Sequence, residues 1–259
     1  MKYTAFISRC LMLLVVLLMS SPEAAMASSS MDTNPRSGRS DPLTLSQLIK
    51  KYPDTFRTKG LSSQQIALTF DDVPDPRFTP QVLDALKEHG VKATFFVVGS
   101  RAEKHPELVL RMKQEGHAIG NHSYNHAQFG KLSLIQFQDQ IQRTNEIIQK
   151  ITGEATLLIR PPYGDITEEQ LLWARKHQYK IVNWNVDSLD WKGLGKDEVK
   201  SNVLSAAGPG AIVLQHAGGG TGSDLSGTIE ALPEIITELR SQGYEFVTLP
   251  ELLSLSEPR

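Results

Sequence analysis

Apolar, β-branched segments alternate with amphipathic helical patterns over about 190 residues, and this alternation constrains the fold more than any other feature. The segments that we expect to be buried strands are Ile66–Phe70, Ala93–Val98, Ala118–Ile119, Leu157–Ile159, Ile181–Val186, Ala211–Gln215 and Glu245–Thr248. The helices expected between them are Gln81–His89, Pro106–Glu115, Ser133–Ile151, Glu168–His177, Lys196–Ala206 and Gly227–Gln242. This order predicts an α/β fold with about seven parallel strands, arranged as a closed barrel or as a doubly wound sheet.

The first residues of the chain predict export. Lys2 and Arg9 precede the apolar run Leu11–Met19, which leads into Ala25-Met26-Ala27, and this is the order of a secretory signal peptide. We therefore expect residues 1–27 to be cleaved and the mature protein to be secreted or associated with the cell wall. The alternative is an uncleaved membrane anchor, for which an apolar run of 9 residues is short.

Residues 28–60 are expected to form a flexible tether and a short helix. The stretch 28–42 is rich in Ser, Pro, Asp and Asn, and Leu43–Tyr52 has an amphipathic pattern. Gly60 breaks the chain before the first apolar strand, so we place the domain at residues 61–255. Cys10 is the one cysteine in the sequence and lies in the predicted signal peptide. The mature protein would therefore rely on its core or on a bound metal for stability, without disulfides.

Charge and composition exclude one class of partner. The formal net charge is −2 and the pI is about 6.4, with no long run of like charges. No positive field is available for a nucleic-acid backbone, so we expect no nucleic-acid partner. No feature indicates an obligate protein partner.

Five polar segments each follow a predicted strand. They are Asp71-Asp72, His122-Ser123-Tyr124-Asn125-His126, Arg160-Pro161-Pro162-Tyr163-Gly164, Asp187-Ser188-Leu189-Asp190-Trp191 and Leu214-Gln215-His216. Each segment alone has a plainer interpretation, such as a solvated turn, a rigid loop, a core aromatic or a structural histidine. Because functional groups gather at the carboxyl ends of strands in parallel α/β folds, we expect the five to share one site.

The residue types suggest metal-assisted chemistry. His122 and His126 are four residues apart, and with a carboxylate from another strand they make a ligand set that leaves positions open for water and substrate. Arg160 could hold a carboxylate in place, and the backbone N–H of Tyr163 could bind a developing oxyanion.

Two further residues suggest a sugar-binding surface and an acid catalyst. Trp191 lies beside two carboxylates, and its flat face suits a pyranose ring, whereas we assign Trp184 to the core. His216, charged with the help of an aspartate, could act as a general acid.

In this order, the five segments resemble those of the polysaccharide deacetylases of carbohydrate esterase family 4, the NodB-homology family. The resemblance covers roughly residues 61–255 and implies a distorted (β/α) barrel with about seven parallel strands. Family members often have Gly-Pro after the paired aspartates, whereas this chain has Val73-Pro74. We expect Val73 to alter the shape of this loop and activity to survive.

The resemblance implies a divalent metal bound by Asp72, His122 and His126. Zinc (Zn2+) is the first expectation, with Co2+ or Ni2+ as alternatives, because such a ligand set does not select one ion. It also implies that Asp71 is the catalytic base and His216 the catalytic acid.

The remaining roles come from the same resemblance. Arg160 would orient Asp71, and Asp190, or as second choice Asp187, would keep His216 charged. The backbone N–H of Tyr163 would stabilise the oxyanion. The acetyl group would lie in a pocket flanked by Trp191 and Leu214.

The function implied is the removal of N-acetyl groups from an acetylated aminosugar polysaccharide. Peptidoglycan N-acetylglucosamine or N-acetylmuramic acid ranks first as substrate, and chitin oligosaccharides rank second. Three alternatives remain open: an esterase for O-acetyl groups as in xylan, a hydrolase for small amides, and a non-catalytic protein that binds the cell wall.

Overall fold

The computed structural model describes residues 42–61 and 64–255. These residues fold around a curled parallel sheet. The strands are β1 (Phe56–Arg57), β2 (Gln65–Val73), β3 (Thr94–Val97), β4 (Ala118–Asn121), β5 (Leu158–Ile159), β6 (Lys180–Val182), β7 (Val186–Asp187), β8 (Ile212–His216) and β9 (Glu245–Phe246). Their order is β1-β6-β5-β4-β3-β2-β8-β7, and β9 pairs with the start of β2. The predicted signal peptide and the tether up to residue 41 lie outside the described residues.

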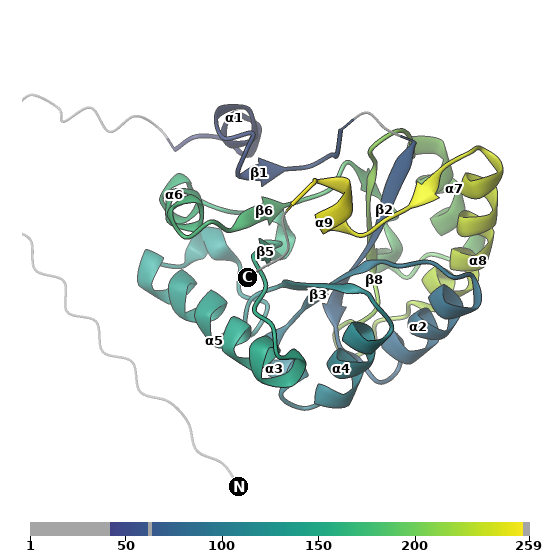
Figure 1. The fold of residues 1–259 in the computed structure, drawn as a ribbon, viewed down its shortest axis with the longest axis horizontal. Helices are drawn as coiled ribbons and strands as arrows, with labels where there is room; N and C mark the ends of the chain where they lie inside the picture. The colour runs from purple at the N-terminus through teal and green to yellow at the C-terminus, as the bar shows by residue number, and fades with distance from the viewer. Residues whose placement is uncertain (1–41, 62–63, 256–259) are drawn as a thin grey trace, which may run out of the picture. The chain divides into compact units, whose positions relative to one another are not determined.

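Helices cover the outer side of the sheet. They are α1 (Leu45–Lys51), α2 (Thr79–Glu88), α3 (Gly99–Ala102), α4 (Pro106–Gln114), α5 (Leu134–Thr152), α6 (Glu168–Lys176), α7 (Lys196–Ala206), α8 (Ser226–Ser241) and α9 (Leu249–Leu252), with single 3-10 turns η1 (Phe129–Lys131), η2 (Pro162–Gly164) and η3 (Asp190–Lys192). In Figure 1, α5, α4, α2 and α8 follow one another around the curved sheet. This arrangement confirms the predicted α/β fold and distorted barrel. No described helix is both long and apolar enough to cross a membrane.

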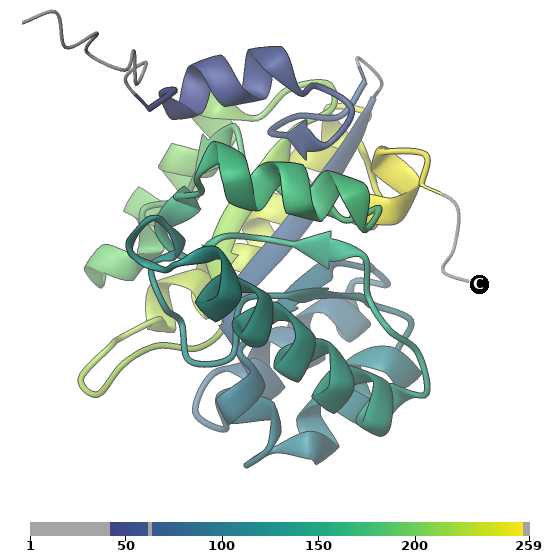
Figure 2. The same ribbon diagram turned by 90° about the vertical axis from the view of Figure 1, so that its left-hand side faces the viewer.

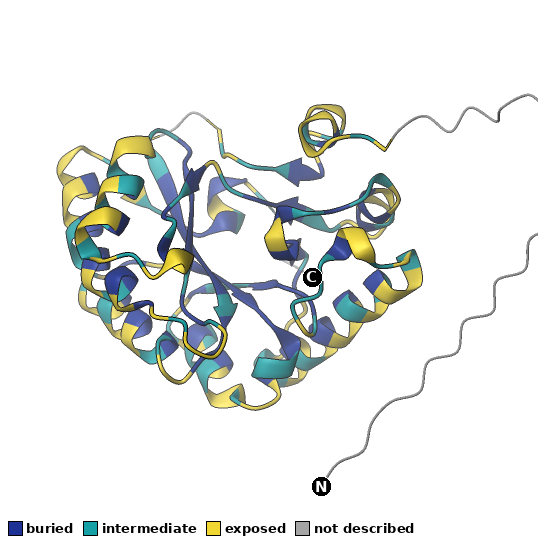
Figure 3. Cartoon of the chain, turned by 180° about the vertical axis from the view of Figure 1, so that it is seen from behind, coloured by how far each residue is buried: buried dark blue, intermediate teal, exposed yellow. Residues whose placement is uncertain are grey.

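The core lies between the strands and the inner faces of these helices. Figure 3 shows buried strands and helices whose outward faces are exposed. Phe70 of β2 and Phe95 of β3 stack with ring centroids 5.3 Å apart. Val73, the residue that departs from the family pattern, is fully buried in the same core cluster. Its side chain therefore packs against the core.

Local sequence signals fix where several helices begin. Thr44, Ser133 and Thr167 each form a capping box with a glutamine three residues later. In this motif two backbone N–H groups that lack helical partners are satisfied reciprocally. Helix α5 is capped at its C-terminus by Gly153, whose φ of 81° is left-handed and favours glycine.

The run predicted as a single strand at Ile181–Val186 is divided in two, and this prediction is corrected. Strand β6 pairs with β1 and β5, whereas β7 pairs with β8 at the other edge of the sheet. Residues 183–185 connect β6 with β7, and the Asn185 side chain accepts a hydrogen bond from the Ile212 N–H at 2.8 Å. No pairing among the described strands joins β7 to β1, so the sheet curls without closing.

The sheet includes residues that precede the predicted domain start at residue 61. Phe56 of β1 is 1% exposed and pairs with Ile181 of β6. Helix α1 lies beside α6 in both ribbon views (Figures 1 and 2), and Lys51 and Tyr52 both donate to Glu168 of α6. The sheet therefore includes β1, a segment that is shorter than a strand typically predicted from sequence.

We predict that Phe56→Ala lowers the free energy of unfolding by about 3 kcal/mol or more, because it removes a buried aromatic side chain and leaves a cavity. Urea denaturation followed by circular dichroism measures this change. The control is Ile135→Ala on α5, whose side chain is 77% exposed, with an expected change below about 0.5 kcal/mol. Equal effects for both variants would show that β1 is not part of the folded core.

Candidate active site

The carboxyl ends of neighbouring strands bring the predicted residues together. Asp71 and Asp72 lie near the end of β2, His122 and Arg160 directly follow β4 and β5, and His216 ends β8. In the parallel register, Asp71 is the partner of His216 across β2 and β8. Five segments that are far apart in the sequence thus meet at the carboxyl ends of the strands.

Asp72, His122 and His126 form a cluster that could hold a metal ion. One donor atom from each residue lies within 4.8 Å of the others. His126 Nε2 is 3.2 Å and His122 Nε2 is 3.7 Å from Asp72 Oδ1. This oxygen is buried and has no hydrogen-bond donor among the described residues. A buried carboxylate oxygen without a partner is unfavourable, and a cation bound at this point would satisfy it. The residues therefore fit the expected metal.

The His122 ring is held in the state that a ligand needs. Burial, only partly offset by the charge of Asp72, lowers its pKa to about 3, so the imidazole is neutral at pH 7. Its Nδ1 lies 2.8 Å from the Arg160 carbonyl oxygen, which accepts the ring N–H. This contact assigns the proton to Nδ1 and leaves the lone pair of Nε2 facing Asp72.

Arg160 orients Asp71 from below. The guanidinium group is fully buried, and its Nη1 donates to Asp71 Oδ1 at 2.8 Å and to Thr69 Oγ1 at 2.7 Å. Its Nε donates to the Val182 carbonyl at 3.0 Å, and the group lies 4.1 Å from the centroid of the Phe96 ring. Burial raises the pKa of Asp71 despite the charge of Arg160, which makes this carboxylate a better proton acceptor.

His216 is paired with Asp190. Its Nδ1 is 2.8 Å from Asp190 Oδ1, and its backbone N–H donates to Asp190 Oδ2 at 2.7 Å. Thr228 of α8 donates to the same Oδ2 at 2.7 Å. Burial alone would lower the pKa of His216, but the charge of Asp190 and its hydrogen bond raise it to about 9. The ring is therefore an imidazolium at neutral pH.

Asp187, the second choice as the partner of His216, has a different contact. Its Oδ1 accepts the backbone N–H of Leu189 at 2.8 Å. Leu189 has a φ of 56°, and the turn that it makes carries Asp190 rather than Asp187 to His216. The structure therefore supports the first choice.

A pocket of about 420 Å³ is lined by Asp71, His216 and the cluster of Asp72, His122 and His126. Leu214 lies in its wall and is 3% exposed, whereas Tyr163 and Trp191 line it with 69% and 55% of their surfaces exposed. Trp184, which the sequence placed in the core, is half-buried and also lines the pocket. An open site with exposed aromatic faces suits sugar rings.

Tyr163 occupies an unusual backbone position. Its φ is 59°, inside the turn η2 that begins at the second of the two prolines, and its ring meets the His126 ring edge-on with centroids 4.9 Å apart. The structure thus brings the predicted oxyanion-binding segment next to the metal cluster.

Two contributors were not found from the sequence. Thr69 lies inside a buried strand and Thr228 in the first turn of a helix, and both bind charged groups of the site. The one available signal for Thr69 was that it is a polar residue within the otherwise apolar run Ile66–Phe70. Thr228 had no comparable signal.

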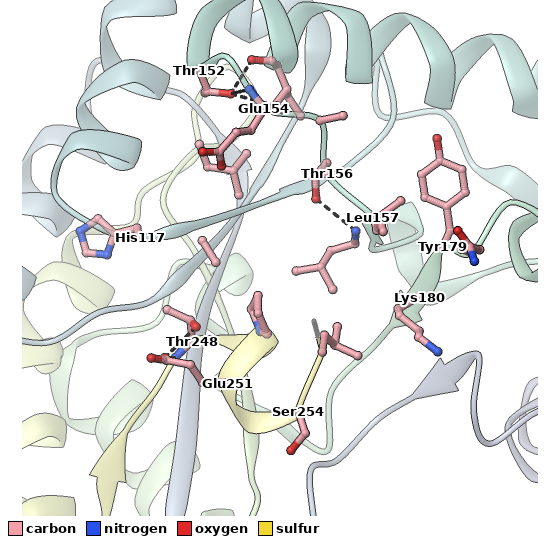
Figure 4. A pocket seen from close by; sticks show the side chains of 18 of the residues that line it. His117, Thr152, Glu154, Thr156, Leu157, Tyr179, Lys180, Thr248, Glu251 and Ser254 are labelled. Carbon is pink, nitrogen blue, oxygen red and sulfur yellow. Dashed lines mark hydrogen bonds between the residues drawn. The ribbon is translucent and has the colours of Figure 1, made fainter. Parts of the chain in front are cut away.

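A larger cavity, about 980 Å³, lies at the opposite ends of the strands (Figure 4). His117, Thr156, Tyr179 and Thr248 are among its lining residues. Thr156 Oγ1 accepts the Leu158 N–H at 3.1 Å, so this polar group serves the local backbone. Among the described residues, the one cluster suited to a metal is that of Asp72 in the smaller pocket, and we assign the chemistry there.

Comparison with known proteins finds a matching family model and similar deacetylases. The polysaccharide deacetylase family model matches residues 58–182. A peptidoglycan-N-acetylglucosamine deacetylase of Bacillus cereus is 45% identical over 211 residues, covering 82% of this chain and 76% of that protein. The peptidoglycan-N-acetylmuramic acid deacetylase PdaA of Bacillus subtilis is 38% identical over 219 residues, covering 83% of this chain and 81% of that protein.

Solved structures share the fold. The Bc1960 peptidoglycan N-acetylglucosamine deacetylase superposes with a TM-score of 0.80 and 44% identity, covering 84% of this chain and 100% of that one. BA3943, a family 4 pseudoenzyme from Bacillus anthracis, gives a TM-score of 0.72 and 32% identity, covering 79% of this chain and 70% of that one.

We predict that Asp190→Asn lowers the pKa of His216 from about 9, because burial, which lowers it, remains while the charge and the hydrogen bond of Asp190 are lost. NMR titration of the ring in metal-free protein measures this shift. In the wild type, the pair stabilises the fold fully below pH 6.5, and this contribution is lost as the pH rises through about 9. The control, Asp187→Asn, should leave the His216 titration unchanged. A similar shift in both variants would contradict the assignment of Asp190.

Proposed function

We propose, since the chain belongs to the polysaccharide deacetylase family, that it is a metal-dependent hydrolase that removes N-acetyl groups from peptidoglycan. One observation carries the proposal: the cluster of Asp72, His122 and His126 lines one pocket together with Asp71 and His216, which are held from behind by the buried Arg160 and Asp190. A site that only binds sugar needs no such combination of a metal cluster, a base and a charged acid. Relatives named as peptidoglycan deacetylases support the same activity.

Asp72, His122 and His126 are the residues that would hold the ion. A bound divalent metal supplies a Lewis acid and lowers the pKa of water. Zinc is our first expectation, because histidine nitrogen and carboxylate oxygen are among its usual ligands, and Co2+ or Ni2+ would suit the same donors.

The protein's own groups account for the proton transfers. Asp71, held by Arg160, accepts a proton from the water that attacks the acetamide carbon. The backbone N–H of Tyr163 donates to the oxyanion that forms there. His216 then donates its proton to the nitrogen as the C–N bond breaks, releasing acetate and leaving a free amine on the sugar.

Peptidoglycan ranks first as substrate and chitin oligosaccharides second. Tyr163 and Trp191 expose aromatic faces at an open pocket, as a polymer of sugar rings would require. Residues 1–27 read as a signal peptide, and we propose that the protein is exported to where peptidoglycan lies.

Two enzymatic alternatives and one non-enzymatic alternative use the same fold. An O-acetyl esterase and a small-amide hydrolase would employ the same groups, so substrate tests must distinguish them. A non-catalytic protein is represented by the similar pseudoenzyme BA3943. In this chain Asp71, His216 and the three ligand residues are all present, which favours catalysis.

We predict that the purified mature chain releases acetate from peptidoglycan faster than from chitin oligosaccharides or acetylated xylan. A chelator should stop this release and added zinc should restore it, because the proposed chemistry requires the metal. Enzymatic assay of free acetate, with sugar analysis for free amines, measures the activity. Release from xylan alone would favour the esterase, and no release from any polymer by zinc-loaded protein would contradict the proposal.

We predict that Asp71→Asn keeps the metal and lowers kcat by about 100-fold or more, because it removes the general base. His122→Ala should lose both metal and activity, because it removes a ligand. Metal content by mass spectrometry and initial rates on one substrate measure the two effects. Near-normal turnover by Asp71→Asn would show that another group is the base.

A further inference from the structure

Helix α3 contacts the backbone beside the two histidine ligands. Its first two amides donate to the carbonyls of Ser123 and Tyr124, at 3.0 and 2.8 Å. These two carbonyls lie in the loop between His122 and His126. The helix therefore fixes the path of the chain that separates the two histidines.

The same helix reaches the third ligand through Arg101. Its Nη1 donates to the backbone carbonyl of Asp72 at 2.7 Å, and its Nη2 donates to the carbonyl of Gly219 at 3.0 Å. One planar guanidinium thus joins the end of β2 to the loop after His216. The rigid fork of arginine suits two acceptors at a fixed separation, which the single ammonium group of a lysine does not.

The acceptor in the second loop is itself held in place. Asp75 Oδ2 accepts the N–H of Gly219 at 3.2 Å, and Arg77 donates to the Gly219 carbonyl at 3.1 Å. Arg77 also binds Asp75 at both carboxylate oxygens. Arg101 Nη1 lies 3.7 Å from Asp75 Oδ2, so its charge is balanced there. Arg101 therefore links Asp72 to a braced loop.

Asp72 needs such a link because its backbone is strained. Its φ is 65°, in the left-handed region that non-glycine residues rarely occupy because it is sterically unfavourable. The neighbouring loop packs closely against it: a Cβ on Gly218 would lie 2.0 Å from the Asp72 carbonyl oxygen and 2.8 Å from Arg101 Nη1. The position of this carbonyl sets the direction in which the Asp72 side chain leaves the backbone.

We propose that Arg101 is a positioning residue that sets the affinity of the site for its metal by fixing the backbone of Asp72. The inference rests on the proposed function only in taking Asp72, His122 and His126 as the ligands. In the described structure, Arg101 donates to a backbone oxygen of this cluster and to none of its side chains. It connects the metal ligands with the loop that follows the proton donor His216.

The test is zinc binding by the metal-free mature chain, measured by competition with a chromophoric chelator. Arg101→Gln and Arg101→Lys should each raise the zinc dissociation constant about tenfold or more, as is typical when residues that orient metal ligands are lost. The lysine variant should fail to rescue, because it keeps the charge and loses the fork. At saturating zinc, the kcat of both Arg101 variants should be lowered by a smaller factor than their zinc affinity is.

Arg111→Gln is the matched control for Arg101. Arg111 lies on the adjacent helix α4, its side chain is 28% exposed against 26% for Arg101, and it also binds several partners. The Arg111→Gln variant should bind zinc with unchanged affinity even if its melting temperature falls. Wild-type affinity in Arg101→Lys, or equal losses in the Arg101 and Arg111 variants, would overturn the inference. A wild type that binds no zinc would instead contradict the metal centre itself.

Gly218→Ala provides a second test that leaves Arg101 in place. The added methyl group presses on the Asp72 carbonyl and should weaken zinc binding in the same direction. Gly220→Ala adds the same group where the nearest atom is 3.9 Å away, and should leave zinc affinity unchanged. Unaltered zinc binding in Gly218→Ala would show that the backbone of Asp72 does not control the site.

Discussion

The buried guanidinium of Arg160 is the interaction on which the site depends. It binds Asp71 and Thr69 at the end of β2 and the Val182 carbonyl at the end of β6, while its own carbonyl accepts the His122 ring. One residue thus joins four strands and orients both the proposed base and one proposed ligand. Breaking a buried ion pair by removing one partner typically costs about 3–5 kcal/mol, so fold and function share this contact.

Residues with strained backbone at the ends of the strands set the directions of the side chains in the site. Parallel strands bring the five segments to one edge, but the direction of each side chain is set locally. Asp72, His126, Tyr163 and Leu189 all have φ values between 56° and 65°, and each lies in or beside the site. Such strain persists where surrounding contacts fix the backbone, and it clusters at functional sites. Arg101 and Arg160 are contacts of this kind.

Much of the fold and most of the site could be predicted from the sequence, because the signals are local. Strand and helix periodicities and the ordered polar segments required no knowledge of the tertiary structure. The division of Ile181–Val186 into two strands could not be predicted, because it depends on how far the sheet curls. Thr228 and Arg101 were not found for a related reason: their partners are 38 and 29 residues away in the sequence. Likewise, β1 joins the sheet with only two residues.

The most direct test of the central claim is a crystal structure of the zinc-loaded protein with anomalous diffraction data at the zinc edge. We expect one strong peak, about 2.0–2.2 Å from single donor atoms of Asp72, His122 and His126. Asp71 should remain bonded to Arg160 with one oxygen directed at the pocket, free to accept a proton. A zinc ion ligated by Asp71, or a peak outside this cluster, would contradict the division of roles between the two adjacent aspartates.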